Sequence, residues 1–358
     1  MSEAVARQLE TELGLRGLLL TADRLAAAEA EASELGAQLL RRLVHVCYPI
    51  SRQGGEAVTL EFDSERAAAR IEGALAFGGV TGRMLMRPAH HSGRRADSIE
   101  LACATFNLGI GLVDGLCDEN AAVGGALLEL MGGQDLEAAV EEPRRRGWLR
   151  SRLPAPLARD PTVAFTAEIV EAFFELLHQV YPADEWLPLR RSVGAKLAAA
   201  LEAERQSVAG SEDQLGRQLL IECSRSTSVL PFEVIETLAA DDYAASAPAA
   251  GTALGEAMWR IDDLVDLYQD ACSGSLNGLL LAVAPGVGRP QDGELFAVLE
   301  SVLASTAIAL AASEAAEKLL AGLQHIGRGG DTLDDHARAA PFVYFVQRYV
   351  GIAPRQPS

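Results

Sequence analysis

Runs of β-branched residues and paired cysteines are both scarce in this sequence, and each scarcity argues against a class of structure. The five cysteines are scattered and odd in number, and no Cys-x-x-Cys pair occurs, so neither a disulfide framework nor a zinc site is indicated. One short run resembles a strand, "VTLEFDSE" at residues 58–65, and we interpret it as a loop or minor hairpin. A disulfide-stapled scaffold and a sheet-based fold are therefore disfavoured.

An excess of basic residues is also lacking. The chain has 31 Lys and Arg against 50 Asp and Glu, a net charge of -19, which argues against nucleic acid or an anionic membrane as the main partner. An anionic substrate remains compatible because metal ions can invert the local charge. We find no uncharged apolar run long enough to span a bilayer and no signal peptide in "MSEAVARQLETELG". We expect a cytoplasmic protein without stable membrane insertion, and a homodimer is compatible with the sequence.

Alanine, leucine and glutamate dominate what is present, mostly with helical periodicity. Apolar residues make up 49% of the 358 residues, which is ample for a core. The run "PTVAFTAEIVEAFFELLHQVY" even begins with proline, a residue favoured at the first position of a helix. We predict one all-α domain over residues 1–358, a bundle of about ten to twelve helices. Residues 141–161 form a basic, proline-rich linker or surface loop within it.

The stretch "WRIDDLVDLYQD", residues 259–270, carries four aspartates on an apolar helix. Asp262, Asp266 and Asp270 follow the i, i+4, i+8 spacing that places side chains in one stripe, with Asp263 beside them. Like charges at this spacing destabilise a helix, and an unpaired buried carboxylate costs several kcal/mol. Something positive must therefore face the stripe, and Mg²⁺ is the cation that carboxylates and phosphate oxygens hold together. The alternative is an exposed acidic face of an amphipathic helix.

A second apolar helix, in "FNLGIGLVDGLCDEN", ends in a similar arrangement. Asp114 and Asp118 lie at i and i+4, with Glu119 adjacent. On the same face, Asn107 and Gly111 are neutral or small and leave space for a ligand. Alone, this pattern is also compatible with a helix that ends in an acidic turn. Together with residues 259–270, it suggests two acid-tipped helices that clamp metal ions between them.

These two patterns resemble the metal-binding motifs of the class I isoprenoid synthase superfamily. The spacing of the four aspartates from Asp262 to Asp270 is similar to the second aspartate-rich motif of trans-prenyltransferases. It also matches the register of the Asn-Asp-x-x-Ser-x-x-x-Glu triad of class I terpene synthases. The spacing of Asp114, Asp118 and Glu119 resembles the first aspartate-rich motif in a degenerate form. The resemblance covers the two motifs and the helical composition.

The resemblance implies a helical bundle around a central apolar cavity, in which both motifs bind three Mg²⁺ ions around a prenyl diphosphate. Metal ions neutralise the leaving diphosphate and promote cleavage of the C–O bond, and the apolar pocket then holds the allylic cation away from water. The implied metal ligands are Asp114, Asp118, Asp262, Asp266 and Asp270.

The resemblance also implies cationic groups that contact the diphosphate. The segment "ECSRSTSVLPFEV" is similar to the Lys-Thr segment of prenyltransferases, which lies in a helix break, and Arg225 takes the place of the lysine. Arg217, two turns earlier, matches a diphosphate-sensing arginine, with a surface arginine as the alternative. Arg348 and Tyr349 resemble the Arg-Tyr pair near the C-terminus of bacterial terpene synthases. Guanidinium groups suit phosphate oxygens because they bind them in a bidentate manner.

Two aromatic residues lie at positions where they could line the substrate pocket. Trp259 precedes Asp262 by three residues and is predicted on the carboxylate face, and Phe345 lies about one turn before Arg348. A ring face attracts cations, so both suit a carbocation pocket. Packing in the core is an equally good interpretation of either ring.

We therefore predict a Mg²⁺-dependent class I terpene synthase that ionises a linear prenyl diphosphate and cyclises or quenches the cation. A prenyltransferase is the alternative. Chain-elongating members carry a Gly-Gly-Lys-Arg-type run near the N-terminus, and we find no such run here. They also carry basic residues after the second motif, whereas "ACSGSLNGLLL" contains no basic residue. A head-to-head condensing enzyme stays open because two Asp-x-x-x-Asp motifs can be traced. A non-catalytic helical bundle that binds a lipid or protein partner is the third interpretation.

Overall fold

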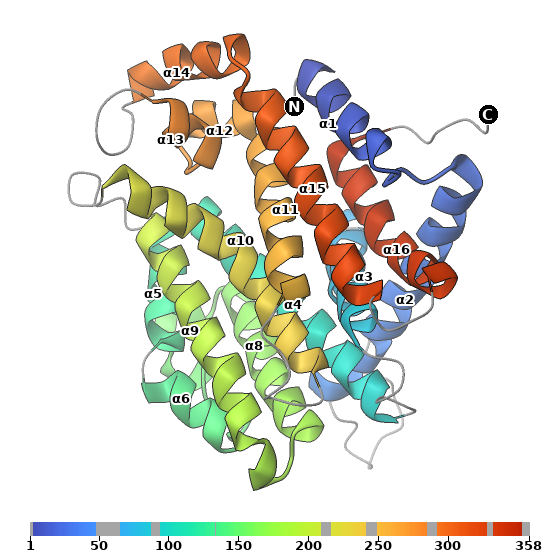
Figure 1. Ribbon diagram of the computed structural model, residues 1–358. Coiled ribbons are helices and arrows are strands. Elements are labelled where there is room, and N and C mark those ends of the chain that lie inside the picture. The colour runs from blue at the N-terminus through green and yellow to red at the C-terminus, as the bar shows by residue number, and fades with distance from the viewer. Residues whose placement is uncertain are drawn as a thin grey trace. The chain divides into compact units, whose positions relative to one another are not determined.

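The computed structural model describes residues 3–47, 65–86, 94–132, 134–208, 216–240, 249–284, 292–327 and 332–352 (Figure 1). Sixteen α-helices and two short 3-10 helices are assigned in these ranges, and the all-α prediction is confirmed. The count exceeds ten to twelve because several helices are short, such as α7 (Ala155–Ala158) and α13 (Gly278–Val283). The strand-like run at 58–64 lies outside the described residues.

The chain divides into two compact units, and each is described by itself. Unit 1 comprises residues 1–26, 199–233 and 247–358, and unit 2 comprises residues 27–198 and 234–246. The boundaries fall within α2 (Ala22–Cys47), α9 (Leu187–Val208) and near the end of α10 (Arg217–Ala239). The single domain over residues 1–358 stays a prediction.

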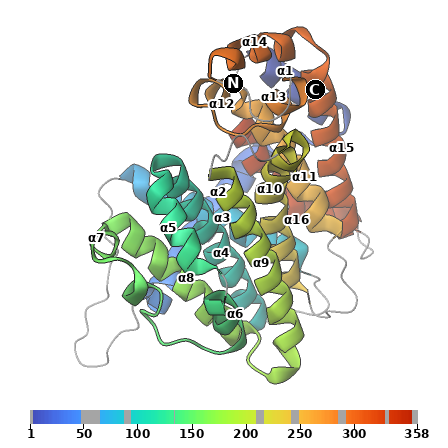
Figure 2. The ribbon, with the colours of Figure 1, turned by 90° about the vertical axis from the view of Figure 1, so that its left-hand side faces the viewer.

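Unit 2 is built around one long apolar helix, α4. Ile99, Ala102 and Cys103 of this helix are fully buried, and α3, α5 and α8 pack against it (Figure 2). Gly78 of α3 permits the close approach, because a Cβ there would lie 2.5 Å from the Cβ of Asn107. The helices that lie wholly within unit 2 are α3 (Glu65–Leu85), α4 (Arg94–Glu119), α5 (Ala121–Met131), α6 (Gln134–Glu141), α7 and α8 (Pro161–Val180), together with the 3-10 helices η1 (Arg150–Arg152) and η2 (Asp184–Trp186).

The apolar character of α4 also bears on the prediction about membranes. Residues 95–119 are long and apolar enough to cross a bilayer by length and composition, and 67% of the window that meets this test is buried inside the protein. The bent pair α14–α15 passes the same test together. A core helix that is apolar on most sides is expected to satisfy such a test, so the packing of α4 accounts for its composition.

The basic, proline-rich segment 141–161 belongs to unit 2 and is held to it by a buried carboxylate. Glu171 of α8 accepts hydrogen bonds from the backbone N–H groups of Gly147 (2.5 Å), Leu149 (2.7 Å) and Arg150 (3.1 Å). Arg146 donates to a carboxylate oxygen of Glu175 at 2.7 Å. The segment is therefore a fixed surface element. At its end, Asp160 caps α8 and Pro161 is the first helical residue, as the sequence predicts.

Unit 1 centres on α11, which packs along α15 over most of its length (Figure 1). Small residues bring the helices together: a Cβ at Gly322 of α15 would lie 2.7 Å from the side chain of Leu254, and a Cβ at Gly255 of α11 would lie 2.6 Å from the Cα of Val229 in α10. The helices that lie wholly within unit 1 are α1 (Glu3–Leu15), α11 (Ala249–Val265), α12 (Leu267–Ser273), α13, α14 (Asp292–Ala304), α15 (Ala307–Gly327) and α16 (Thr332–Val350).

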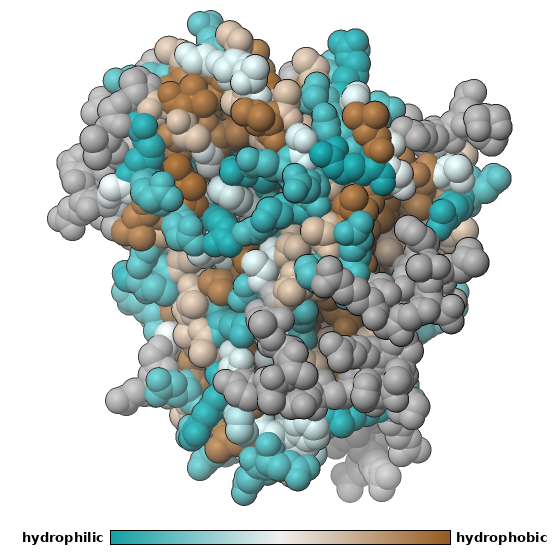
Figure 3. Space-filling model, in the orientation of Figure 1, coloured by the Kyte–Doolittle hydropathy of each residue, from teal (hydrophilic) through white to brown (hydrophobic). Residues whose placement is uncertain are grey.

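Apolar side chains also reach the surface of unit 1. Phe296 and Leu303 of α14 and Leu310 of α15 are about half exposed or more, and Figure 3 shows apolar residues at the surface over these helices. The other face of α14 is buried through Leu295, Leu299 and neighbouring residues. The exposed face of α14 thus mixes Phe296 and Leu303 with Glu294 and Glu300.

Candidate active site

The helix that carries the four aspartates is interrupted at Asp266. Helix α11 ends at Val265, α12 begins at Leu267, and Asp266 between them has φ -96° and ψ 3°. Its N–H still donates to the carbonyl of Asp262 at 2.9 Å, and the N–H of Asp270 donates to the carbonyl of Asp266 at 2.8 Å. The backbone therefore bends in the sparsely populated bridge region, where many active-site residues lie. Asp262, Asp266 and Asp270 therefore do not lie on one uninterrupted helix.

Two of the four aspartates converge on one point, the hydroxyl of Tyr349. This hydroxyl lies 2.5 Å from Oδ1 of Asp262 and 3.0 Å from Oδ2 of Asp266. Burial of the phenol oxygen and the two carboxylates raise the pKa of Tyr349, so the hydroxyl keeps its proton and donates it. The structure thus joins the second aspartate motif to the C-terminal Arg-Tyr pair that the resemblance singles out.

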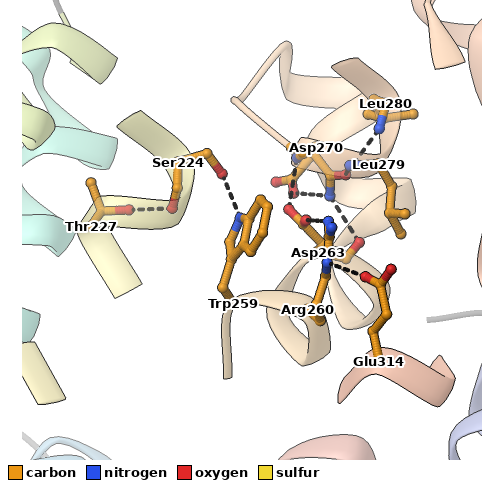
Figure 4. A network of polar contacts seen from close by, with 11 residues as sticks. Ser224, Thr227, Trp259, Arg260, Asp263, Asp270, Leu279, Leu280 and Glu314 are labelled. Atoms are coloured by element: carbon orange, nitrogen blue, oxygen red, sulfur yellow. Dashed lines mark hydrogen bonds and ion pairs between the residues drawn. The ribbon is translucent and has the colours of Figure 1, made fainter. Parts of the chain in front are cut away.

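Asp263 points the other way, into the protein. Its side chain is buried, and Oδ1 accepts a hydrogen bond from the N–H of Gly278 at 2.8 Å (Figure 4). Oδ2 has no hydrogen-bond partner and lies 3.7 Å from a guanidinium nitrogen of Arg260. Burial, with the charges of Asp262 and Asp270, raises the pKa of Asp263 to about 8 despite the Gly278 and Arg260 contacts. Asp263 therefore anchors α13 and does not face the Asp262–Asp266 pair.

Asp270 contacts a residue that the sequence analysis missed, Asn277. The side-chain amide of Asn277 donates to Oδ2 of Asp270 at 2.9 Å and to the carbonyl of Asp263 at 2.8 Å. Its own oxygen accepts from Leu279 and Leu280 and so caps α13. Asparagine directly before the apolar run "GLLLAV" was the available signal. That Asp270 binds metal stays a prediction.

Trp259 lies on the Asp263 side of α11, not with Asp262 as its spacing suggested. It is 6% exposed, and a Cβ at Gly278 would lie 2.7 Å from both its ring and Asp263. The indole N–H donates to Oγ of Ser224 on α10 at 3.0 Å, and the guanidinium of Arg260 lies 4.0 Å from the ring centroid (Figure 4). These contacts make it a packing residue between α10 and α11, and a role in the pocket stays a prediction.

Arg225 lies in a continuous helix, whereas the similarity to prenyltransferases implied a helix break. Helix α10 runs through Arg225 and even through Pro231, and Val229 packs closely against Gly255. The guanidinium of Arg225 pairs with Glu222 at 2.8 Å and Glu256 at 2.6 Å. These contacts belong to an ion-pair network, so the role of Arg225 toward diphosphate stays a prediction. Arg217 is the first residue of the same helix.

Glu256 is the acidic centre of this network. Its other oxygen lies 2.5 Å from Nζ of Lys318 on α15. Although partial burial acts in the opposite direction, the contacts with Lys318 and Arg225 lower the pKa of Glu256, which therefore stays ionised. The network links three helices of unit 1, α10, α11 and α15.

The C-terminal pair lies at the end of α16. Arg348 is exposed and donates to the hydroxyl of Tyr344 at 2.5 Å, while the rings of Tyr344 and Phe345 lie 5.2 Å apart. Phe345 itself is half-buried. The exposed guanidinium is one residue from the tyrosine that contacts both carboxylates.

The first aspartate motif lies at the C-terminal end of α4 in unit 2. Asp114, Asp118 and Glu119 are exposed there, and a Cβ at Gly111 would meet open space. Asn107 instead donates to the carbonyl of Ala74 at 2.9 Å, which ties α4 to α3. The clamp between the two motifs stays a prediction.

A small apolar cavity of about 20 Å³ adjoins the same helix. Phe106 and Ile110 of α4 and Phe173 of α8 help to line it, and the two phenylalanine rings lie 5.3 Å apart. This cavity lies within unit 2, and the central cavity of the predicted bundle stays a prediction.

The donor set at the Asp262–Asp266 pair fits a hard cation. Among the residues that the structure describes, no three acidic, histidine or cysteine side chains group as a metal site. Two convergent carboxylates nevertheless suffice for Mg²⁺, which usually keeps several waters and takes its remaining ligands from substrate phosphates.

No family model matches the chain, and no curated protein matches it. It is similar to linalool/nerolidol synthase from Streptomyces clavuligerus, at 16% identity and a TM-score of 0.42 over 93% of this chain and 96% of that one. The same enzyme in complex with 2-fluorogeranyl diphosphate is 16% identical, with a TM-score of 0.42 over 94% of this chain and 97% of that one. Farnesyl diphosphate synthase from T. brucei is 12% identical, with a TM-score of 0.36 over 93% of this chain and 99% of that one.

Proposed function

We propose that the protein is a Mg²⁺-dependent class I terpene synthase, which ionises a linear prenyl diphosphate and cyclises or quenches the resulting carbocation. The observation that carries this proposal is the convergence of Asp262 and Asp266 on one point at the bend between α11 and α12. This pair belongs to the sequence pattern that resembles a metal motif of the superfamily.

The roles of the residues follow from their placement. Asp262 and Asp266 would hold Mg²⁺, and by resemblance Asp114 and Asp118 would supply the other half of a three-ion site. Bound Mg²⁺ would neutralise the departing diphosphate as the C–O bond breaks and its electron pair leaves with the oxygen. Arg348, directly before Tyr349 in the sequence, has an exposed side chain. Its guanidinium would donate charge-assisted hydrogen bonds to phosphate oxygens.

The segment after Asp270 favours a synthase over a chain-elongating prenyltransferase. Prenyltransferases place basic residues there, whereas here Asn277 and Gly278 are buried and engaged with Asp263 and Asp270. A second diphosphate would find no cation in this part of the described chain, since residues 271–284 contain neither lysine nor arginine. A head-to-head condensing enzyme remains the second candidate, because both Asp-x-x-x-Asp motifs are present.

The test is a product analysis with the purified protein and Mg²⁺. Geranyl, farnesyl and geranylgeranyl diphosphate are each supplied, with and without isopentenyl diphosphate, and the products are identified by mass spectrometry. The proposal predicts a hydrocarbon or alcohol from one diphosphate alone. A longer diphosphate, or a condensed product that retains two prenyl chains, would assign the protein to the prenyltransferases. If no substrate is consumed, the result contradicts the proposal and favours a non-catalytic binding protein.

A further inference from the structure

The hydroxyl of Tyr349 contacts the same two carboxylate oxygens that a cation shared by Asp262 and Asp266 would bind. It lies 2.5 Å and 3.0 Å from one oxygen of each carboxylate. Mg²⁺ binds carboxylate oxygens at about 2.0–2.1 Å and demands near-ideal octahedral geometry. A cation bound to both of these oxygens would take the carboxylate lone pairs that now accept the hydroxyl proton. The cation and the donated proton exclude each other.

Without a cation, this hydroxyl compensates for a charge problem. Asp262 and Asp266 are one turn apart, and like charges at this spacing repel. A neutral hydroxyl between them offers a hydrogen bond to ionised oxygen, an interaction stronger than one between neutral groups. It therefore holds the two carboxylates close together and directed at one point.

The backbone on which Tyr349 lies is fixed, so only the side chain is free to give way. Helix α16 ends in a Schellman-type cap, in which Ile352 N–H donates to the carbonyl of Gln347 at 3.0 Å and Gly351, with φ 70°, donates to that of Arg348 at 3.1 Å. Val350 is fully buried. Tyr349 itself, in contrast, is 41% exposed, so its side chain borders solvent.

We infer that Tyr349 is a positioning residue that holds the Asp262–Asp266 pair together in the metal-free protein and is displaced by the entering cation. The inference rests on the proposed function only in that the ligand of the pair is a divalent cation. It adds that metal binding is weakened by the hydrogen bonds that must break, and that binding reorients the tyrosine beside Arg348.

The test measures Mn²⁺ binding to the full-length protein by electron paramagnetic resonance and Mg²⁺ binding by calorimetry, both without substrate. Tyr349→Phe removes the hydroxyl and keeps the ring. We expect about tenfold tighter binding, the factor that corresponds to loss of one hydrogen bond to a charged group. Tyr268→Phe is the control for loss of a phenol hydroxyl: this residue of α12 is 60% exposed and is not among the predicted metal ligands, and we expect unchanged affinity. Equal or weaker binding by Tyr349→Phe would overturn the inference.

A second measurement follows the tyrosine in the wild-type protein, and a variant serves only to assign its resonance. In wild-type protein labelled with ¹³Cζ-tyrosine, the Tyr349 resonance, identified by its loss in Tyr349→Phe, should shift on addition of Mg²⁺. An unshifted resonance at saturating Mg²⁺ would refute displacement. Asp262→Asn separates this inference from the proposed function. If it abolishes metal binding but the wild type turns over no prenyl diphosphate, the proposed function fails while the role of Tyr349 stands.

Discussion

At the scale of single residues, neighbours with the same side chain take opposite roles. Asp262 is exposed and shares the hydroxyl of Tyr349, whereas Asp263 is 3% exposed and bound to the N–H of Gly278. One residue turns an α-helix by about 100°, which is enough to move a side chain from surface to core. Sequence spacing identified the acidic motif, but Ile261 and Leu264 on either side gave no indication of which aspartate would be buried.

A buried histidine in unit 2 makes stability depend on pH. His178 of α8 donates from Nε2 to the carbonyl of Ala139 at 2.8 Å, and burial lowers its pKa below the ordinary value of 6.5. The unfolded chain therefore takes up the proton first as the pH falls through 6.5. This uptake lowers the free energy of unfolding from pH 7 to pH 5, whereas the raised pKa of Asp263 acts in the opposite direction. We predict that the contribution of His178, measured in urea as the difference between the wild type and a variant without this titration, destabilises the fold as the pH falls.

His178→Gln removes this titration, while the amide of the introduced glutamine can still donate a hydrogen bond to the carbonyl of Ala139. Relative to the wild type, the variant should become more stable as the pH falls from 7 to 5. His45→Gln, at an exposed position in the last turn of α2, should leave the wild-type slope. A wild-type slope in His178→Gln would show that another group causes the dependence.

At the scale of elements, helical periodicity predicted most of the helices, and the bend at Asp266 was not predictable from it. The backbone hydrogen bonds from Asp266 and Asp270 to the preceding turn persist across the bend, so no helix-breaking residue is needed. The cause is tertiary: Asn277 and Gly278 bind Asp263 and Asp270 and hold α12 and α13 against α11. Such contacts join residues about 15 positions apart, beyond the reach of periodicity.

Gly278 is the position where this arrangement is most sensitive. A Cβ there would lie 2.7 Å from Oδ2 of Asp263 and 2.7 Å from the ring of Trp259. Gly278→Ala should therefore lower the free energy of unfolding by about 2 kcal/mol, the usual cost of overpacking. Denaturation in urea measures it.

Gly73→Ala on α3 is the control, because a Cβ there would meet nothing within 4 Å. This substitution should raise the free energy of unfolding by roughly 0.5–1 kcal/mol, since alanine is the better helix former. If both variants are equally stable, Gly278 has no special packing role.

At the scale of the whole molecule, the helical class was predictable from composition, whereas the placement of the cationic groups was not. The sequence predicted a contact of Arg225 with diphosphate, which stays a prediction, but not the ion pairs of Arg225 with Glu222 on its own helix and Glu256 on α11. For a protein with a net charge of -19, the anionic substrate of the proposed function would require local cations. The proposed function therefore depends on divalent metal at Asp262 and Asp266.

The most direct test is the Mg²⁺ dependence of diphosphate release from a prenyl diphosphate, compared between the wild type and Asp262→Asn. The wild type should release diphosphate with saturable dependence on Mg²⁺ and none in EDTA, and the variant, folded as judged by circular dichroism, should be slower by about 100-fold or more. Release that is undiminished in EDTA, or equal in the variant, would contradict the account.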